Sequence, residues 1–240
     1  MIQPLKHKRV LLKITGEALK GRSGPFDKEA IDFIAQEIKS AQTTDTELII
    51  VLGGGNIVRG NQLTRDVGIA KAPADMMGMM ATVMNGIALQ NVLEKMLVQT
   101  RVMSAIEIKA VTETFFYRKA LSHLEQGRVV ILAGGTGVPG LSTDTCAVLR
   151  ALELDAQAVY KGTKVDGVYD KDPVRYPTSA KLIPKLTHQQ FLDAKLEQIL
   201  DVTAVSRAQQ DKLPIVVFRI FQKSNLLRVL RGENVGSLIS

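Results

Sequence analysis

Three glycine-rich segments of the chain follow stretches that read as buried strands, and their residue types suit phosphate binding. They cover residues 13–17, 53–56 and 134–137. In an open α/β sheet, ligands bind beyond the carboxyl ends of the strands, where backbone N–H groups and helix N-termini favour an anion. The three segments could therefore converge on one polyphosphate.

The most informative signal lies around the third segment. Residues 129–133 (VVILA) predict a buried strand, residues 143–154 predict a helix, and residues 156–160 predict a second strand that delivers Lys161. Asp144 stands at the start of the predicted helix. This β–loop–α–β unit indicates a phosphate-handling site, and its acidic residue suggests chemistry as well as binding.

Three further residues have both a chemical and a structural interpretation. Lys13 ends the first predicted strand. It is either an edge lysine that extends to solvent or a lysine that neutralises a phosphoryl group in transfer. Asp75 opens a long predicted helix, where a carboxylate that only complements the helix dipole explains the residue equally well. Arg59 follows the triple glycine and could bind phosphate with its planar fork.

Two common nucleotide-binding motifs are disfavoured. The phosphate-loop motif GxxxxGK[ST] is absent from the sequence. Gly135, Gly137 and Gly140 match the GxGxxG dinucleotide fingerprint, but Pro139 lies inside it and the predicted helix begins only near Thr143. No acidic residue ends a strand at the distance that the fingerprint requires, so we do not favour a nicotinamide or flavin enzyme.

Strand and helix patterns alternate along the chain, which predicts an α/β sandwich with a mainly parallel sheet. Strands are expected at residues 10–12, 48–52, 102–105, 129–133, 156–160, 214–220 and 237–239, the last at an edge of the sheet. Helices are expected at residues 75–97, 115–126, 143–154, 189–200, 203–210 and 224–230, and after Asp27 with Ile31, Ile34, Ile38 and Ala41 on one face. We expect a single domain over residues 1–240, with two lobes that meet near residue 155.

The composition is that of an ordinary globular protein, with 45% hydrophobic and 23% charged residues. The net charge of +7 invites a nucleic-acid partner, but basic and acidic residues are interleaved and aromatic residues make up only 5%. The single cysteine, Cys146, and three histidines argue against a disulfide framework and a zinc site. We find no apolar run long enough to span a bilayer and no secretory leader, and therefore expect a cytoplasmic enzyme.

Five segments together resemble a known family over nearly the whole chain. They are LLKITGEALKG (residues 11–21), VLGGGNIVRG (51–60), DMMGMMATVMNG (75–86), GGTGVPGLSTDT (134–145) and KGTKVDGVYDKDP (161–173). In this order and spacing they closely resemble the bacterial UMP kinases of the amino acid kinase superfamily, with Thr15 where serine is usual. The second and third segments are the pair that singles out the UMP kinases within the superfamily.

The resemblance implies a three-layer α/β/α sandwich and the reaction MgATP + UMP → ADP + UDP, a step of pyrimidine nucleotide synthesis. Lys13 and Lys161 would neutralise the transferring phosphoryl group, and Asp144 and Asp201 would organise these lysines. Mg²⁺ would be carried on ATP oxygens, with no metal site built by the protein alone. The acceptor would bind in the lobe before about residue 155, and ATP in the lobe from about residue 156.

The resemblance also assigns the two nucleotides to particular residues. ATP would contact Lys13, Ile14, Thr15, Gly16, Gly55, Arg59, Thr163, Tyr169 and Asp172. UMP would contact Gly54, Asp75, Thr136, Gly137, Val138, Pro139, Gly140, Leu141, Ser142 and Thr143. The family usually has an Asn-Pro-aromatic-aromatic-Thr-Thr run in the acceptor loop, so we expect looser contacts to uracil from residues 138–143 here.

The remaining expectations concern partners. A homohexamer, built as a trimer of dimers, and regulation by GTP or UTP are implied by the resemblance alone. Residues 76–80 (MMGMM) favour a subunit interface over a cofactor site, because the predicted helix is apolar nearly all round. ATP and UMP are thus the expected partners, and neither nucleic acid nor a membrane is expected.

Overall fold

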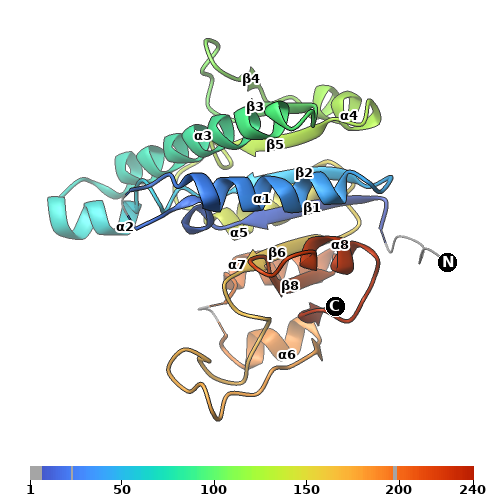
Figure 1. Ribbon diagram of the computed structural model, residues 1–240. Helices are drawn as coiled ribbons and strands as arrows, with labels where there is room; N and C mark the ends of the chain where they lie inside the picture. Colours follow the sequence, from blue (N-terminus) through green and yellow to red (C-terminus); the bar gives the residue numbers. More distant parts are fainter. Residues whose placement is uncertain (1–6, 23, 197–198) are drawn as a thin grey trace.

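The computed structural model describes residues 7–22, 24–196 and 199–240. Within these ranges, nine strands form one sheet in the order β4-β3-β5-β2-β1-β6-β8-β9-β7 (Figure 1). The strands are β1 (Arg9–Ile14), β2 (Glu47–Leu52), β3 (Thr100–Ser104), β4 (Glu113–Thr114), β5 (Val129–Ala133), β6 (Val159–Thr163), β7 (Lys185–Leu186), β8 (Ile215–Arg219) and β9 (Ser237–Ile239). All strand pairs are parallel except β8 with β9. The predicted, mainly parallel α/β sheet is therefore confirmed.

Helices cover both faces of this sheet. They are α1 (Lys28–Ala41), α2 (Gly60–Gln62), α3 (Lys71–Lys95), α4 (Tyr117–Glu125), α5 (Thr143–Glu153), α6 (His188–Asp193), α7 (Val202–Gln210) and α8 (Asn225–Leu230). A 3₁₀ turn, η1 (Gly16–Leu19), follows β1, and a π-helical turn, η2 (Leu63–Val67), continues α2. One apolar core joins the sheet to α1, α3 and α8, and the other joins it to α4, α5, α6 and α7. The molecule is thus the expected three-layer sandwich.

Strand β1 shows how the sheet serves both cores. Val10, Leu12 and Ile14 lie in the core beneath α1 and α3, whereas Leu11 lies in the core beneath α5. This alternation follows from the two-residue period of a strand, and it makes a strand between two helical layers apolar along its length. Lys13 breaks that apolar run on the α5 side, which places a charged residue inside the molecule.

The first long helix agrees with its sequence pattern. The Asp27 carboxylate accepts a hydrogen bond from the Ala30 N–H at 2.9 Å, so it caps α1 as expected. Ile31, Ile34 and Ile38 of that helix are buried. Their spacing of three and four residues directs one face toward the sheet.

Helix α3 begins earlier than the sequence suggested. We expected it to open at Asp75, but it begins at Lys71, so Asp75 lies in its second turn and does not cap it. Pro73 therefore lies in the first turn of the helix. A proline in the first turn is tolerated, however, because the N–H that it lacks would have no partner within the helix.

Several other boundaries differ from expectation. Helix α6 ends at Asp193 instead of continuing to residue 200, and Lys195 has a φ of 51°, a left-handed conformation that a helix does not continue through. The end of the expected helix includes residues 197–198, which lie outside the described ranges. Strand β9 is not an edge, because β7 pairs with its outer side. A two-residue strand such as β7 is too short to show a periodic signal.

The expectation that no segment could span a bilayer also needs correction. Within the described ranges, α3 is long enough to cross a membrane, and an 18-residue window of it, with a mean hydropathy of 1.2, is apolar enough by composition. Its Val83, Leu89 and Leu93 nevertheless belong to the core shared with α1 and the sheet. We therefore interpret α3 as a core helix that packs along the sheet.

Candidate functional site

The centre of the candidate site is a pair of lysines on neighbouring strands. Strands β1 and β6 are parallel, and their register places Lys13 opposite Lys161. Both side chains point into the layer of α5, where Leu11 and Val159 lie two residues earlier on the same strands. Both lysines are buried, with 9% and 8% of their surface exposed. Lys13 is therefore not an edge lysine extending to solvent, and Lys161 lies within β6 instead of after it.

Asp144 joins the two lysines. It is the second residue of α5. Its Oδ1 lies 2.9 Å from Lys13 Nζ and its Oδ2 lies 2.6 Å from Lys161 Nζ. Lys161 also donates a hydrogen bond to the carbonyl of Ile199. Asp144 thus contacts both lysines, as a residue that organises them would, and its part in catalysis stays a prediction.

The three charges leave the cluster with an excess positive charge in a buried setting. Burial alone would raise the pKa of Asp144, but the two ammonium groups outweigh it and lower the pKa to about 2. Burial and the charge of Lys13 together lower the pKa of Lys161 to about 8, against the opposing attraction of Asp144. The cluster is thus suited to receive an anion, and Asp144 is a poor proton acceptor.

Asp201, which the resemblance implied to be a second organising aspartate, acts on Lys161 through its charge and makes its hydrogen bonds to other groups. It precedes α7 and accepts hydrogen bonds from the Thr203 N–H at 2.9 Å and the Thr145 hydroxyl at 2.8 Å. The Ser142 hydroxyl also donates to it. Burial would raise the pKa of Asp201, but these two hydroxyl donors and the backbone N–H lower it. Asp201 therefore ties the N-termini of α5 and α7 together, and among the described ion pairs none links it to either lysine.

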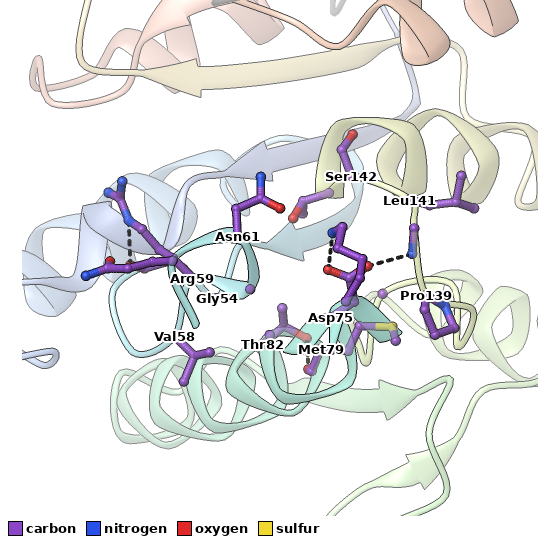
Figure 2. Close-up of a pocket in the computed structure, with 18 of the residues that line it drawn as sticks. Gly54, Val58, Arg59, Asn61, Asp75, Met79, Thr82, Pro139, Leu141 and Ser142 are labelled. Carbon is purple, nitrogen blue, oxygen red and sulfur yellow. Dashed lines mark hydrogen bonds and ion pairs between the residues drawn. The ribbon is translucent and has the colours of Figure 1, made fainter. Parts of the chain in front are cut away.

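A cavity of about 800 Å³ (Figure 2) is lined by Thr143, the residue before Asp144, and by Asp201, whereas Lys13, Asp144 and Lys161 are not among its lining residues. Its lining includes eight residues expected to contact the acceptor: Gly54, Asp75, Val138, Pro139, Gly140, Leu141, Ser142 and Thr143. Thr136 and Gly137, which were also expected there, do not line it. The Thr136 hydroxyl instead donates to the carbonyl of Val138 at 3.1 Å, so Thr136 stabilises the conformation of the loop.

Asp75 connects the floor of the cavity to the loop above it. Its Oδ1 lies 2.5 Å from Lys71 Nζ, one helical turn earlier, and its Oδ2 accepts the Gly140 N–H at 2.9 Å (Figure 2). Gly140 has a φ of 91°, which glycine adopts without the strain that a side chain would add. A carboxylate can accept about four hydrogen bonds, so Asp75 keeps capacity for a ligand.

Two residues expected on the ATP side lie in the same cavity. They are Gly55 and Arg59. The Arg59 guanidinium lies 2.6 Å from the Glu17 carboxylate, which follows β1, and in Figure 2 Arg59 and Pro139 lie at opposite ends of the cavity. The structure therefore brings these residues together with the acceptor set.

The other residues expected to bind ATP lie outside this cavity. Ile14, Thr15 and Gly16 run from the end of β1 into η1, and a side chain on Gly16 would overlap the Gly53 carbonyl. The Thr163 hydroxyl at the end of β6 donates to the Val165 carbonyl at 2.6 Å. These residues end adjacent strands, so they share one edge of the sheet with the lysines.

Two expected ATP contacts lie in the long connection after β6. The Tyr169 hydroxyl donates to Asp166 at 3.1 Å, and Tyr169 forms an isolated bridge with Leu182. Asp172 accepts the Val174 N–H at 2.8 Å and so closes a turn. Both residues thus have a local structural role in addition to any contact with a ligand.

Sequence reasoning missed several residues of the cavity wall. From α3 these are Lys71, Gly78, Met79 and Thr82, and from the α2–η2 segment they are Asn61, Gln62 and Arg65. Gly78, Met79 and Thr82 follow Asp75 by three, four and seven residues, so the helical face that carries Asp75 would have revealed them. The α2–η2 segment is short and has no periodic pattern that could have been read. Gly135 and Thr203 also line the cavity.

The lone cysteine has no part in this site. Cys146 is buried on α5, and burial raises the pKa of its thiol to about 11. It is therefore a packing residue, as its sequence context indicated. Within the described ranges, no group of three or more histidine, cysteine or acidic side chains is placed to hold a metal ion.

Comparison with known proteins agrees with this geometry. The model of the amino acid kinase family matches residues 8–219. A uridylate kinase of Wolinella succinogenes is 46% identical over 230 residues, which are 95% of each chain. The crystal structure of UMP kinase from Bacillus anthracis superposes with a TM-score of 0.93 at 36% identity, covering 98% of this chain and 96% of that one. The crystal structure of UMP kinase from Ureaplasma parvum superposes with a TM-score of 0.90 at 33% identity, covering 98% of this chain and 100% of that one. The chain therefore belongs to the amino acid kinase family.

Proposed function

We propose that this protein transfers the γ-phosphoryl group of MgATP to UMP and releases ADP and UDP. The observation that carries the proposal is the Lys13–Asp144–Lys161 cluster, which joins two adjacent parallel strands and whose Asp144 directly follows Thr143 of the cavity lining. The relative from Wolinella succinogenes carries the name uridylate kinase and supports UMP as the acceptor.

The acceptor nucleotide occupies the cavity. Asp75 accepts hydrogen bonds from the ribose hydroxyls through the lone pairs that Lys71 and Gly140 leave free. Arg59, with the backbone of Gly54 and Gly55, binds the acceptor phosphate, since a guanidinium matches phosphate oxygens in pairs. This placement moves Arg59 and Gly55 from ATP to the acceptor, because both line the cavity that contains Asp75.

Phosphoryl transfer takes place against the lysine cluster. Lys13 and Lys161 neutralise the charge that spreads over the phosphoryl oxygens, and Asp144 holds the two ammonium groups at a fixed separation. No general base is required, because the attacking phosphate oxygen is already anionic. The lowered pKa of Asp144 fits this role, since such a carboxylate stays ionised and does not take a proton.

ATP approaches from the other side of the lysines. The loop of Ile14, Thr15 and Gly16 lies at the end of β1, where backbone N–H groups can bind phosphate. Thr163, Tyr169 and Asp172 lie beyond the end of β6 and would contact the ribose and base. The division into an acceptor lobe and an ATP lobe on one continuous sheet is part of this proposal.

Mg²⁺ enters as part of the substrate MgATP. Both carboxylate oxygens of Asp144 are engaged by lysines, so this residue is not free to build a metal site with its neighbours. The ion would neutralise charge on the ATP phosphates. Lys13 and Lys161 supply the protein's own share of that neutralisation.

The proposal also includes contacts between subunits and regulation by nucleotides. Met80 and Met84 on α3 are 45% and 50% exposed, which supports a contact between subunits along this helix. A hexamer and effector binding by GTP or UTP are proposed on the family resemblance, and a cytoplasmic location is proposed on the sequence features described above.

A coupled assay of ADP release tests the activity directly. UMP, CMP, dUMP and AMP are compared as acceptors at saturating MgATP. UMP is expected to give the highest kcat/KM. CMP is expected to give the next highest, because residues 138–142 lack the amide and aromatic side chains that the family usually has in contact with uracil. Absence of ADP release with every acceptor, or a preference for AMP, would refute the proposal.

A further inference from the structure

Two buried polar residues of α3, Thr82 and Asn85, each hold one of the glycine loops of the site. They lie three residues apart in a helix that is otherwise apolar on its buried side. Thr82 is 5% exposed and Asn85 is wholly buried. A buried polar group is costly unless it is hydrogen-bonded, so the partners of these two side chains indicate why they are there.

Asn85 is bonded to the loop that follows β2. Its Nδ2 donates to the Gly53 carbonyl at 2.7 Å and to Asn56 Oδ1 at 2.7 Å. Asn56 Nδ2 donates back to Asn85 Oδ1 at 2.9 Å and to the Pro25 carbonyl at 2.8 Å. Every donor and acceptor atom of this amide pair is thus engaged, and the pair closes both ends of the Gly53–Gly54–Gly55–Asn56 turn against α3.

Thr82 is bonded to the loop that follows β5. Its hydroxyl accepts the Gly134 N–H at 2.8 Å and donates to the Met79 carbonyl in its own helix at 2.7 Å. Gly134 begins the acceptor loop, and its φ of 73° turns the chain away from the strand. The position at which this loop leaves the sheet is therefore fixed by Thr82.

Close backbone packing makes the loops sensitive to these contacts. A side chain on Gly54 would lie 2.5 Å from the Gly78 carbonyl of α3, and one on Gly16 would overlap Asn56 Oδ1. The loop after β2 is thus pressed between α3 and the loop after β1. A shift of the amide pair would move Gly16 as well as Gly54, whereas the Thr82 hydroxyl bonds only to the acceptor loop and to its own helix.

We propose that Thr82 and Asn85 are positioning residues. Thr82 holds the acceptor loop and Asn85 holds the triple-glycine loop, so that the two loops keep the relative position that phosphoryl transfer needs. This inference rests on the proposed function of the cavity. It predicts that the two residues have different effects. Thr82 affects binding of the acceptor alone, whereas Asn85 affects binding of both nucleotides and turnover.

Matched variants of the full chain test this difference. Thr82→Val keeps the shape of the side chain and removes its hydroxyl, and Thr82→Ser restores the hydroxyl. Asn85→Leu removes the amide at similar volume. Leu93→Ala is the structural control, because Leu93 is fully buried on the same helix and lies away from the cavity lining.

Two readouts are measured for each variant. Steady-state kinetics with each nucleotide varied should give a rise of about 10-fold in KM for UMP with Thr82→Val, while KM for ATP and kcat stay within about twofold. Thr82→Ser should stay near wild type. Asn85→Leu should lower kcat and raise both KM values. Hydrogen–deuterium exchange should quicken in residues 134–142 with Thr82→Val, in residues 53–57 with Asn85→Leu, and selectively in neither with Leu93→Ala.

Three results overturn the inference. The first is that the Thr82 and Asn85 variants change the kinetics no more than Leu93→Ala does at an equal loss of thermal stability. The second is that Thr82→Ser is impaired as much as Thr82→Val. The third is that hydrogen–deuterium exchange quickens evenly across both loops. Should Asn85→Leu fail to fold, Asn56→Ala breaks the same amide pair from the loop and takes its place.

If the wild type does not phosphorylate UMP, the proposed function fails. Loop-selective exchange would then support the positioning role, and its absence would reject it.

Discussion

Lys13 on β1 is the register partner of Lys161 on β6, so two buried ammonium groups face the same layer from adjacent parallel strands. Strand pairing brings the like charges together, and the carboxylate of Asp144 forms an ion pair with each of them. This arrangement concentrates positive charge at the one edge of the sheet where the glycine loops end.

Replacing Lys13 by methionine should remove most of the activity and little of the stability. Methionine keeps the apolar stem, and the Asp144–Lys161 pair that remains is neutral. Loss of one charge-stabilising group typically lowers kcat by about 100- to 1,000-fold. Turnover and urea unfolding should be measured on the same preparation. A variant with near wild-type kcat would show that Lys13 does not contact the transferring group.

Asp144→Asn should instead destabilise the protein. It leaves two buried ammonium groups without a counter-charge, and breaking a buried ion pair in this way costs about 3–5 kcal/mol. The double variant Lys13→Met/Asp144→Asn should recover part of that loss, because it removes one of the like charges. Urea unfolding of the wild type, both single variants and the double variant checks this as a double-mutant cycle. Additive losses would contradict the ion-pair network.

The stability supplied by Asp144 should depend on acid pH. Its pKa is lowered from 3.8 to about 2, so its contribution is fully present above pH 3.8 and is lost as the pH falls toward about 2. The shift corresponds to about 2 kcal/mol. Acid titration of unfolding in urea, compared with Asp144→Asn, should show this loss in the wild type alone.

Lys161 should make activity and stability respond to alkaline pH in opposite directions. Its pKa is lowered from 10.5 to about 8, so between these values the unfolded state binds more protons than the folded state. Its contribution to stability should therefore rise with pH in that window. The charge needed for transfer is meanwhile lost, so kcat should fall above about pH 8. Parallel pH profiles of kcat and of urea unfolding check both signs, and a flat kcat through this window would contradict the role of Lys161.

The sequence revealed the fold and the lysine–aspartate cluster of the candidate site because both depend on patterns that repeat over a few residues. Apolar runs and their glycine ends located β1, β2 and β5, and Asp144 was read correctly at the start of α5. The partners of Asp201 could not be read, because they depend on how the N-termini of α5 and α7 are packed together. The loop-holding contacts of Asn85 were missed for a similar reason, since an asparagine inside an apolar helix shows nothing of its partners 29 and 32 residues away.

Asp75→Asn should chiefly weaken acceptor binding. The amide still accepts the Gly140 N–H, but it loses the charge that strengthens hydrogen bonds from ribose hydroxyls. We expect KM for UMP to rise about 10-fold or more while kcat changes little. Lys71→Gln is the matched control, because it breaks the ion pair with Asp75 and keeps the carboxylate. A loss confined to kcat would place Asp75 with the reacting groups.

Asp201→Ala should affect activity less than the lysine variants do. Asp201 bonds to hydroxyls and to the first turn of α7, so its loss removes a helix cap worth about 1 kcal/mol and releases Ser142 at the end of the acceptor loop. The expected result is a moderate fall in melting temperature and a rise in KM for UMP, with kcat reduced by about 10-fold at most. Ser142→Ala should reproduce the KM effect without the loss of the cap on α7. A fall in kcat as deep as that of Lys13→Met would instead mean that Asp201 reaches the lysines during turnover, through a movement of α7 toward β6.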